Sequence, residues 1–309
     1  MKIDEMLKII QDIDSDKMNL YMVHRIKSKR KNSKGYSILN PTIQSEFKKQ
    51  LKTIVIDELN YYKELTPIAY NPVGSLADNV EYAKISDFPS ISLLQVALEN
   101  PVEKYNFSNS NFACFIYEFP YVNKKGETSS LLVFRRTNKF KKFKKGFMGY
   151  LVDGSFKKLS NKDILATDNN IDFIMDDKIA YIFQHISFER IFNLRNEFRD
   201  KAIEVLKNKK LSEKIENFDK LKDIALDDQS YVKRLAKLSD SNNDPTLFLS
   251  NLEDTKKVIE DFHLDIEIDK DNDKLIFKNE SQVSSIIGLM QDAYYKTLIG
   301  KSIGMDKRR

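Results

Sequence analysis

The sequence predicts an α+β protein, with an antiparallel sheet and flanking helices in its first part and a mostly helical second part. Residues 171–183 contain two apolar runs around a polar turn at 176–178, and each run is too short for a helix and rich in strand-forming residues. After Ser187, which suits an N-cap, the apolar residues from Phe188 to Val205 recur three or four positions apart, as on one face of a helix. We therefore divide the chain into a strand-rich basic domain, residues 1–185, and a mainly helical domain, residues 186–309.

The first domain combines helices with a meander of strands. Apolar spacing predicts a helix at 3–13, a second helix that opens at Pro41 and includes Leu59, and a short helix at 91–98. Residues 18–26 have a strand composition, whereas the proline-containing residues 66–89 predict an ordered loop. Strands at 111–119 and 128–135 flank a turn at 123–126, and a third strand spans 147–152. With the runs at 171–175 and 179–183 they predict an antiparallel meander of about five strands.

The second domain reads as a series of helices with one small hairpin. Helical spacing continues over 188–206, 211–224 and 230–238, and Asp244-Pro245 is an N-cap followed by proline at the first helical position. The apolar runs at 264–268 and 275–277 flank a polar turn and predict the hairpin. The last helix is expected at 283–298, with Tyr294 and Leu298 on its inner face.

Composition places the chain among globular proteins of a reducing compartment. The 309 residues are 41% hydrophobic and 31% charged, so a sizeable core can form. Cys114 is the one cysteine, which excludes a disulfide within the chain. No run of eighteen apolar residues occurs, and the acidic, amphipathic start is unlike a signal peptide. We expect a cytoplasmic protein, held at the inner membrane face only if a partner recruits it.

The net charge of +5 is concentrated in the first domain. Residues 1–185 carry 28 Lys and Arg against 22 Asp and Glu, whereas residues 186–309 carry 23 against 24. This asymmetry predicts an anionic partner for the first domain.

Two basic segments are the candidate contacts with that partner. The first lies between two predicted strands, is interleaved with phenylalanines, and has no acidic residue between Glu127 and Asp153. Its basic residues are Arg135, Arg136, Lys139, Lys141, Lys142, Lys144 and Lys145. The second segment contains Arg25, Lys27, Lys29, Arg30 and Lys31. Lysines and arginines neutralise phosphates, and the absence of a helix-turn-helix or zinc-finger pattern predicts binding with little sequence specificity. The alternative is a solvated turn whose charges face water.

Catalytic and metal-binding patterns are weak. Asp176 with Lys178, or Asp271 with Asp273, supplies the carboxylates of a metal-dependent nuclease, but both pairs lie in predicted turns, where such residues are expected anyway. The string from Asp269 to Glu280 mimics a calcium loop with Lys274 where the sharp turn needs glycine. The three histidines are far apart, and no phosphate-cradling glycine loop occurs. We therefore expect no catalytic residue, metal or cofactor, with the nuclease kept as an alternative.

Several local strings resemble the KwaB family of the bacterial Kiwa anti-phage defence system. These strings are Asp87-Phe88-Pro89, Phe134-Arg135-Arg136, Asp153-Gly154-Ser155-Phe156, Asp172-Phe173-Ile174, and Tyr181-Ile182-Phe183 leading into Ser187-Phe188-Glu189-Arg190-Ile191-Phe192. The resemblance implies a cytoplasmic DNA-binding effector that works with a small membrane partner, KwaA. It supplies no catalytic motif, so the DNA contacts named above rest on the charge pattern alone.

Together these observations predict a sequence-nonspecific double-stranded DNA-binding effector in anti-phage defence. The helical domain is expected to support self-association, as a homo-oligomer and most simply a dimer. The alternatives are the metal-dependent nuclease and a non-catalytic interaction subunit whose basic loops meet a protein or a membrane surface.

Overall fold

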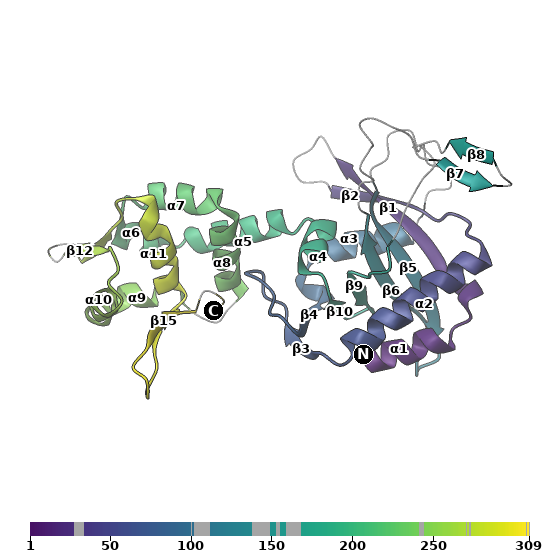
Figure 1. The fold of residues 1–309 in the computed structure, drawn as a ribbon. Helices are drawn as coiled ribbons and strands as arrows, with labels where there is room; N and C mark the ends of the chain where they lie inside the picture. The colour runs from purple at the N-terminus through teal and green to yellow at the C-terminus, as the bar shows by residue number, and fades with distance from the viewer. Residues whose placement is uncertain are drawn as a thin grey trace. The chain divides into compact units, whose positions relative to one another are not determined.

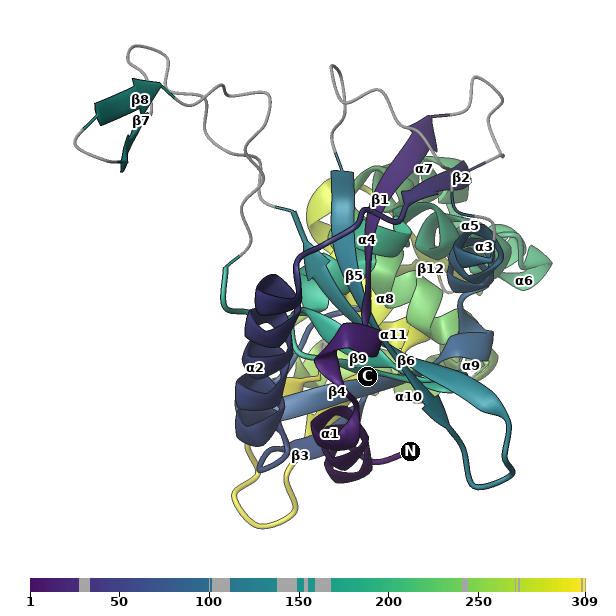
Figure 2. The same cartoon turned by 90° about the vertical axis from the view of Figure 1, so that its right-hand side faces the viewer.

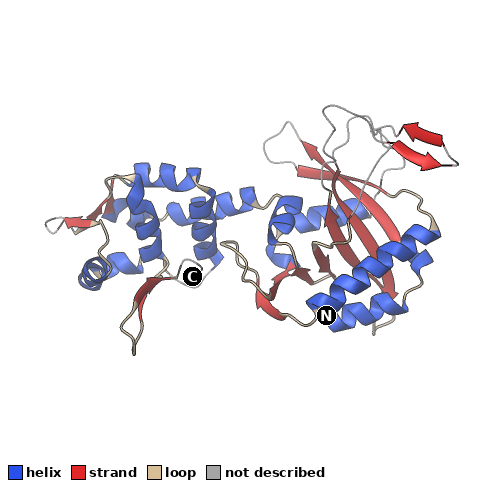
Figure 3. Cartoon of the chain, in the orientation of Figure 1, coloured by secondary structure: helices blue, strands red, loops and turns tan. Residues whose placement is uncertain are grey.

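The computed structural model describes residues 1–27, 34–99, 101, 112–137, 149–152, 155–158, 168–240, 244–269, 271, 273–306 and 308 (Figure 1). Contacts divide the chain into two compact units. The first comprises Met1–Tyr70 and Leu76–Phe192, and the second comprises Asn71–Ser75 and Asn193–Arg309. The first unit holds a large sheet covered by helices and the second is mainly helical, which confirms the α+β class (Figure 3). Whether these units are separate functional domains stays a prediction.

An eight-stranded sheet organises the first unit. Its strands in spatial order are β2 (Lys34–Leu39), β1 (Asn19–Lys27), β5 (Phe112–Val122), β6 (Thr128–Arg136), β9 (Phe173–Met175), β10 (Ile179–Ile182), β4 (Asn79–Lys84) and β3 (Thr66–Ala69). All neighbours are antiparallel except β3 and β4, which are parallel. The β5–β6 and β9–β10 hairpins confirm two predicted pairs, and Gly126 turns the first with a φ of 82°.

Two predictions about this sheet were wrong. The strand expected at 147–152 is β7 (Gly149–Val152), which pairs with β8 (Ser155–Lys158) in a separate two-stranded sheet. Residues 66–89, expected to be a loop, contain β3, β4 and the first residue of a helix. Pro67 lies in β3 at the edge of the sheet, where a strand tolerates proline because one side of its backbone needs no ladder partner. The pairing of β4 with β10, and of β3 with β4, therefore outweighed the local proline signal.

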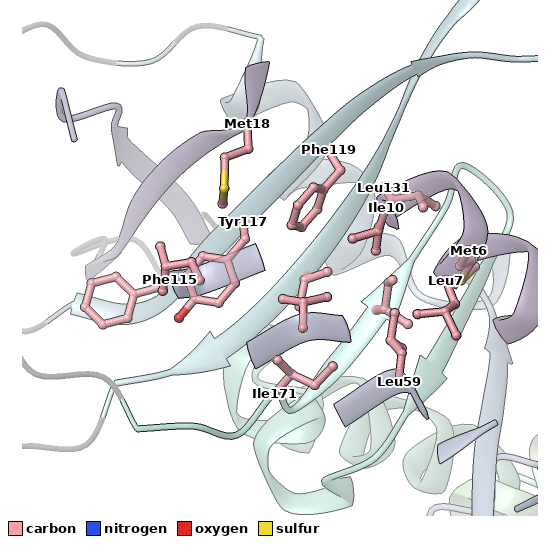
Figure 4. Close-up of a cluster of buried hydrophobic side chains, with 14 of the residues drawn as sticks. Met6, Leu7, Ile10, Met18, Leu59, Phe115, Tyr117, Phe119, Leu131 and Ile171 are labelled. Carbon is pink, nitrogen blue, oxygen red and sulfur yellow. The ribbon is translucent and has the colours of Figure 1, made fainter. Parts of the chain in front are cut away.

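Two helices cover one face of the sheet and enclose the main core. The helices are α1 (Ile3–Asp12) and α2 (Ser45–Tyr62), which pack against each other (Figure 2). Alternate residues of β5, namely Phe115, Tyr117 and Phe119, point toward this layer because successive side chains of a strand face opposite sides. Met6 and Ile10 of α1 meet them in the buried cluster shown in Figure 4.

The opposite face is covered by an aromatic layer around α4 (His185–Phe192). Phe134 of β6 stacks on Phe173 of β9, with ring centroids 4.2 Å apart. Phe188 and Phe192 of α4 contact this pair edge-on or tilted, at 5.3 to 6.0 Å. Such pairs contribute about 0.5–1.5 kcal/mol each beyond their buried area. Helix α3 (Pro89–Leu98) begins with its proline at the first turn and packs near β2.

The helix predicted over 188–206 is two helices. Helix α4 ends at Phe192 and α5 spans Arg195–Leu206, with Asn193 between them in the left-handed conformation, at a φ of 52°. Asparagine tolerates this conformation better than most residues, so it ends α4 there. The predicted N-cap, Ser187, lies inside α4, which begins at His185.

The second unit contains most of the helices. After α5 come α6 (Lys209–Lys214), α7 (Phe218–Asp227), α8 (Gln229–Asp240), α9 (Leu247–Ser250), α10 (Leu252–Asp261) and α11 (Val283–Met290). A small three-stranded sheet has the strand order β11 (Ile215–Glu216), β13 (Lys274–Ile276) and β12 (Glu267–Asp269). The antiparallel pair β12–β13 confirms the predicted hairpin. Short 3-10 helices lie at Ser15–Lys17, Ile85–Asp87 and Glu280–Gln282.

Two helix lengths in this unit were overestimated. The helix expected over 211–224 breaks at Asn217, and the one expected over 283–298 stops at Met290. Asn217 and Asp292 both have positive φ values, 58° and 49°. After Asp292 the chain forms the hairpin of β14 (Tyr294–Lys296) and β15 (Ile303–Met305). Leu298, expected on an inner helix face, lies 87% exposed between these strands.

Candidate nucleic-acid interface

The strands that lead into the two basic segments end at the same end of the large sheet. Lys27, the last residue of β1, pairs with Lys34, the first residue of β2. Next to β1, the register pairs His24 with Phe112 at the start of β5, and β5 in turn pairs Cys114 with Arg136 at the end of β6. The segments 28–33 and 138–148, more than a third of the chain apart, therefore leave from strands separated only by β5 (Figure 1).

The ends of β1 and β6 are two strand spacings apart. Neighbouring strands lie about 4.8 Å apart, so the ends of β1 and β6, with β5 between them, lie about 10 Å apart.

Most of the predicted contact residues fall outside the described chain. Those are Lys29, Arg30, Lys31, Lys139, Lys141, Lys142, Lys144 and Lys145. Lys27 ends β1 and Arg136 ends β6, so both lie where a segment begins. The side chains of Arg25 and Arg135 are described, and both bind other groups of the protein.

Arg135 forms an ion-paired cluster with two aspartates. Its Nη1 donates to Oδ1 of Asp172 at 2.8 Å, and its Nη2 pairs with Asp168. Burial lowers the pKa of the guanidinium, but the hydrogen bonds and charges of Asp168 and Asp172 outweigh it and raise that pKa above its usual value. A phosphate contact by Arg135 would have to compete with both carboxylates.

Asp172 fixes the end of β6 from two sides. Its side chain is fully buried, and while Oδ1 accepts from Arg135, Oδ2 accepts from the backbone N–H of Arg136. The backbone N–H of Asp172 also donates to the Phe134 carbonyl at 2.8 Å. A buried carboxylate is stable only with such partners. Asp172 thus holds β6 where the basic segment at 138–148 departs.

Arg25 fastens α4 to the sheet. Its Nη2 donates to the carbonyl oxygen of Ile191 at 2.7 Å and also to that of Arg190. These are carbonyls of the last turn of α4, where the helix dipole favours a cation. These hydrogen bonds show that Arg25 positions α4 against the sheet. Its predicted contact with phosphate stays a prediction.

The acidic residues of the nuclease alternative lie in two turns, and Asp176 also pairs with the N-terminal ammonium of Met1 at 3.2 Å. Oδ1 of Asp176 accepts from the backbone N–H groups of Lys178 and Ile179, each at 2.7 Å, and Asp269 accepts from the N–H of Asp271 at 2.9 Å. Asp273 adopts a left-handed φ of 50° in the β12–β13 turn. Within the described ranges, no group of three His, Cys, Asp or Glu is arranged to hold a metal ion.

A second buried ionic cluster, which the sequence did not reveal, surrounds His185. Its Nδ1 lies 2.6 Å from Glu81 Oε2 and its Nε2 lies 2.9 Å from Glu189 Oε1. Tyr70 stacks on the imidazole and donates its hydroxyl to Glu189 at 3.0 Å. Burial lowers the pKa of His185, but the two carboxylates outweigh burial and raise it to about 9. The cluster joins α4 to β4, and no local pattern marks it because Glu81 and His185 lie far apart in the sequence.

This cluster predicts a pH-dependent stability of the first unit. Since the folded pKa of His185 is raised above its ordinary value of 6.5, its contribution is fully present below pH 6.5 and is lost as the pH rises to about 9. We expect the free energy of unfolding to fall by about 3 kcal/mol over this window, at about 1.4 kcal/mol per pKa unit. Urea unfolding of wild type and His185→Gln, at about pH 6.5 and about pH 9, measures this change in the free energy of unfolding.

The difference in the pH dependence of unfolding between wild type and His185→Gln separates the contribution of His185 from that of other titrating groups. His185→Gln should show a flatter profile, whereas His263→Asn, an exposed histidine of the second unit, should keep the wild-type drop. Parallel profiles for wild type and His185→Gln would contradict the assignment.

Cys114 and His24 are both uncharged at pH 7 because of burial. Cys114 is fully buried, and burial raises the pKa of its thiol well above the usual value. Burial likewise lowers the pKa of His24. These directions leave the thiol protonated and the imidazole neutral at pH 7.

Comparison with protein families settles where the chain belongs. The family model described as "Kiwa protein KwaB-like" matches residues 123–300, more than half of the chain. The chain belongs to the KwaB-like family. It is therefore a component of Kiwa anti-phage defence. Neither the curated proteins nor the solved structures gave a match.

The KwaB-like match covers one basic segment and not the other. It includes β6, β9, β10, α4 and the residues Arg135, Asp172 and His185, together with the segment at 138–148. Residues 28–33 precede it. Among the described residues, no helix is long and apolar enough to cross a membrane.

Proposed function

We propose that this KwaB-family protein binds double-stranded DNA without sequence specificity as its part in anti-phage defence. The observation that carries the proposal is that the strands preceding the two basic segments, β1 and β6, are separated only by β5 and end at the same end of the sheet. Lysine contacts to phosphates supply affinity without reading bases, so the binding should be nearly independent of sequence.

The contacts are divided between two groups of cations. The segment at 138–148 supplies the first group, Lys139, Lys141, Lys142, Lys144 and Lys145, and residues Lys27, Lys29, Arg30 and Lys31 supply the second. Arg136 stands at the edge of the first group. Arg25 and Arg135 support the interface by holding α4 and the end of β6. Asp172 is a positioning residue in this arrangement.

The partners of this function are also part of the proposal. A small membrane protein, KwaA, would keep the DNA-binding protein at the inner membrane face. A homodimer would present two sheet ends to one duplex and so raise the effective concentration of phosphate contacts.

A salt titration of duplex binding tests the proposal. Full-length protein is titrated with a short duplex of arbitrary sequence and with a shuffled duplex, in the presence and absence of Mg²⁺. Each neutralised phosphate contributes about −0.9 to the slope of log K against log salt, so the nine cations of the two groups give a slope of about −8. We expect equal affinity for both duplexes and intact DNA after incubation.

Each outcome distinguishes the proposal from an alternative. Cleavage that requires Mg²⁺ and is lost in Asp176→Ala or Asp271→Ala would replace it by the metal-dependent nuclease. Absence of binding even at low salt would refute DNA binding and leave the basic segments to a protein or membrane surface.

A further inference from the structure

The yellow β14–β15 hairpin of the second unit can be followed in Figure 1. The turn at its end carries two exposed aliphatic side chains. Leu298 is 87% exposed and Ile299 is 99% exposed. Single exposed apolar residues are common on protein surfaces, but here two adjacent ones form the tip of a projecting element. This tip has no role in the DNA-binding function proposed above.

The turn that presents the two side chains is hydrogen-bonded. The backbone N–H of Thr297 donates to the Ser302 carbonyl at 2.8 Å, and that of Ser302 donates to the Thr297 hydroxyl at 2.9 Å. The N–H of Lys301 donates to the Thr297 carbonyl at 3.1 Å. The tip is therefore ordered before any partner arrives, which lowers the entropic cost of binding.

The base of the hairpin is fixed to the second unit. A Cβ on Gly288 of α11 would come 2.5 Å from the Met305 side chain and 3.0 Å from the Tyr294 ring, so both strands pack tightly on the helix. The ring of Tyr295 covers Gly304 of the opposite strand, where a Cβ would come within 2.7 Å of it. The two apolar side chains of the tip are more exposed than Tyr295 and Ile303 of the strands, which are about half exposed.

The charges around the tip have one sign. Residues 293–305 contain Lys296 and Lys301 and no acidic residue. Lys296 lies 3.9 Å from Asp261 at the base, but both side chains are about half exposed, so the pair is weak. Leu298 and Ile299 share the turn at the end of the hairpin with Lys301, and Lys296 and the half-exposed Tyr295 lie on β14 behind this turn.

This order matches the profile of a membrane interface. Aliphatic groups enter the acyl region, tyrosine prefers the headgroup level, and lysines extend toward anionic headgroups. A convex two-residue tip needs a fitted pocket in a protein partner, whereas a lipid surface accommodates it without one. We propose that the β14–β15 hairpin is a peripheral membrane contact that inserts Leu298 and Ile299 into an anionic lipid surface.

Sedimentation with vesicles tests the contact. We expect the full-length protein to sediment with phosphatidylcholine vesicles that contain phosphatidylglycerol. The Leu298→Ser/Ile299→Ser variant should bind them at least about tenfold more weakly, because two buried aliphatic side chains are lost. Lys296→Gln/Lys301→Gln should weaken binding about fivefold per lysine, and only for the anionic vesicles. Both pairs are exposed, so circular dichroism and duplex binding should stay as in wild type.

A fluorescent reporter gives a direct reading of insertion. The chain contains no tryptophan, so Ile299→Trp places a single indole at the tip. We expect its emission to shift to the blue on addition of anionic vesicles and to be quenched by brominated acyl chains. Val122→Trp, an exposed position at the end of β5, is the matched control and should show neither change.

Several results would overturn the proposal. One is sedimentation of Leu298→Ser/Ile299→Ser equal to that of wild type, which would assign any vesicle binding to the basic segments instead. Another is an unshifted Ile299→Trp emission with anionic vesicles. A wild-type dimer that becomes a monomer in the serine variant would assign the tip to a second copy of the chain. If the wild-type protein binds vesicles but no duplex, the DNA proposal is refuted and the membrane proposal stands.

Discussion

Replacement of Asp172 by asparagine should destabilise the first unit by about 3–5 kcal/mol, the usual cost of removing one partner of a buried ion pair. The carboxylate is fully buried, and it accepts hydrogen bonds from the Arg135 side chain and from the backbone of Arg136. Its loss removes the fully buried counter-charge of the Arg135 guanidinium, which is itself mostly buried, and leaves the more exposed Asp168 as its ion-pair partner. The effect exceeds that of typical point substitutions.

Asp168→Asn is the matched control for this prediction. It removes a partner of the same guanidinium, but the Asp168 side chain is 43% exposed, so we expect a loss of about 1 kcal/mol or less. Urea unfolding, with amide hydrogen exchange of β6 and β9 to identify the first unit, measures both variants. An Asp172→Asn protein no less stable than Asp168→Asn would show that this pair does not hold the sheet end.

Neutralisation of the basic segment at 138–148 should remove about half of the salt dependence of duplex binding. With Lys139, Lys141, Lys142, Lys144 and Lys145 changed to glutamine, the slope of log K against log salt should become less negative by about 4.5. Affinity should fall by the same factor for every duplex sequence, because phosphate contacts carry no sequence information. The titration described for the wild type measures the change.

Five exposed lysines of the second unit provide a control with the same change in net charge. They are Lys207, Lys209, Lys220, Lys257 and Lys278, each changed to glutamine. This control should keep nearly the wild-type slope, because its charges lie on a different unit from the proposed interface. Equal slopes for the two variants would mean that binding follows total charge and not a defined interface.

Helix ends were the least predictable part of the fold. The apolar spacing of the sequence continues across Asn193, Asn217 and Asp292, yet each has a positive φ and a helix ends or begins next to it. Asparagine and aspartate adopt this conformation at low cost, but they do so only where packing on both sides requires the chain to turn. Periodicity therefore located the helices of the second unit and overestimated their lengths.

The positioning residues of the candidate interface were hidden for a different reason. Asp172 alternates with apolar residues in the sequence, a pattern that is typical of a residue facing water. It is buried because Arg135, from another strand, supplies a charge and hydrogen bonds there. The cluster of Glu81, His185 and Glu189 likewise forms only when α4 packs beside β4.

The sequence by itself determined the α+β class, the β5–β6 and β9–β10 hairpins, the two basic segments and the resemblance to the KwaB family. These features depend on local composition, spacing and turn residues, which act over a few positions. Only the tertiary structure decided that the strands leading into both basic segments end together, and that Leu298 and Ile299 form an exposed tip. Such features depend on pairs that the local pattern does not encode, such as Val23 with Cys114 and Tyr295 with Gly304. Burial and exposure follow from those pairs, because a side chain is buried only when distant elements cover it.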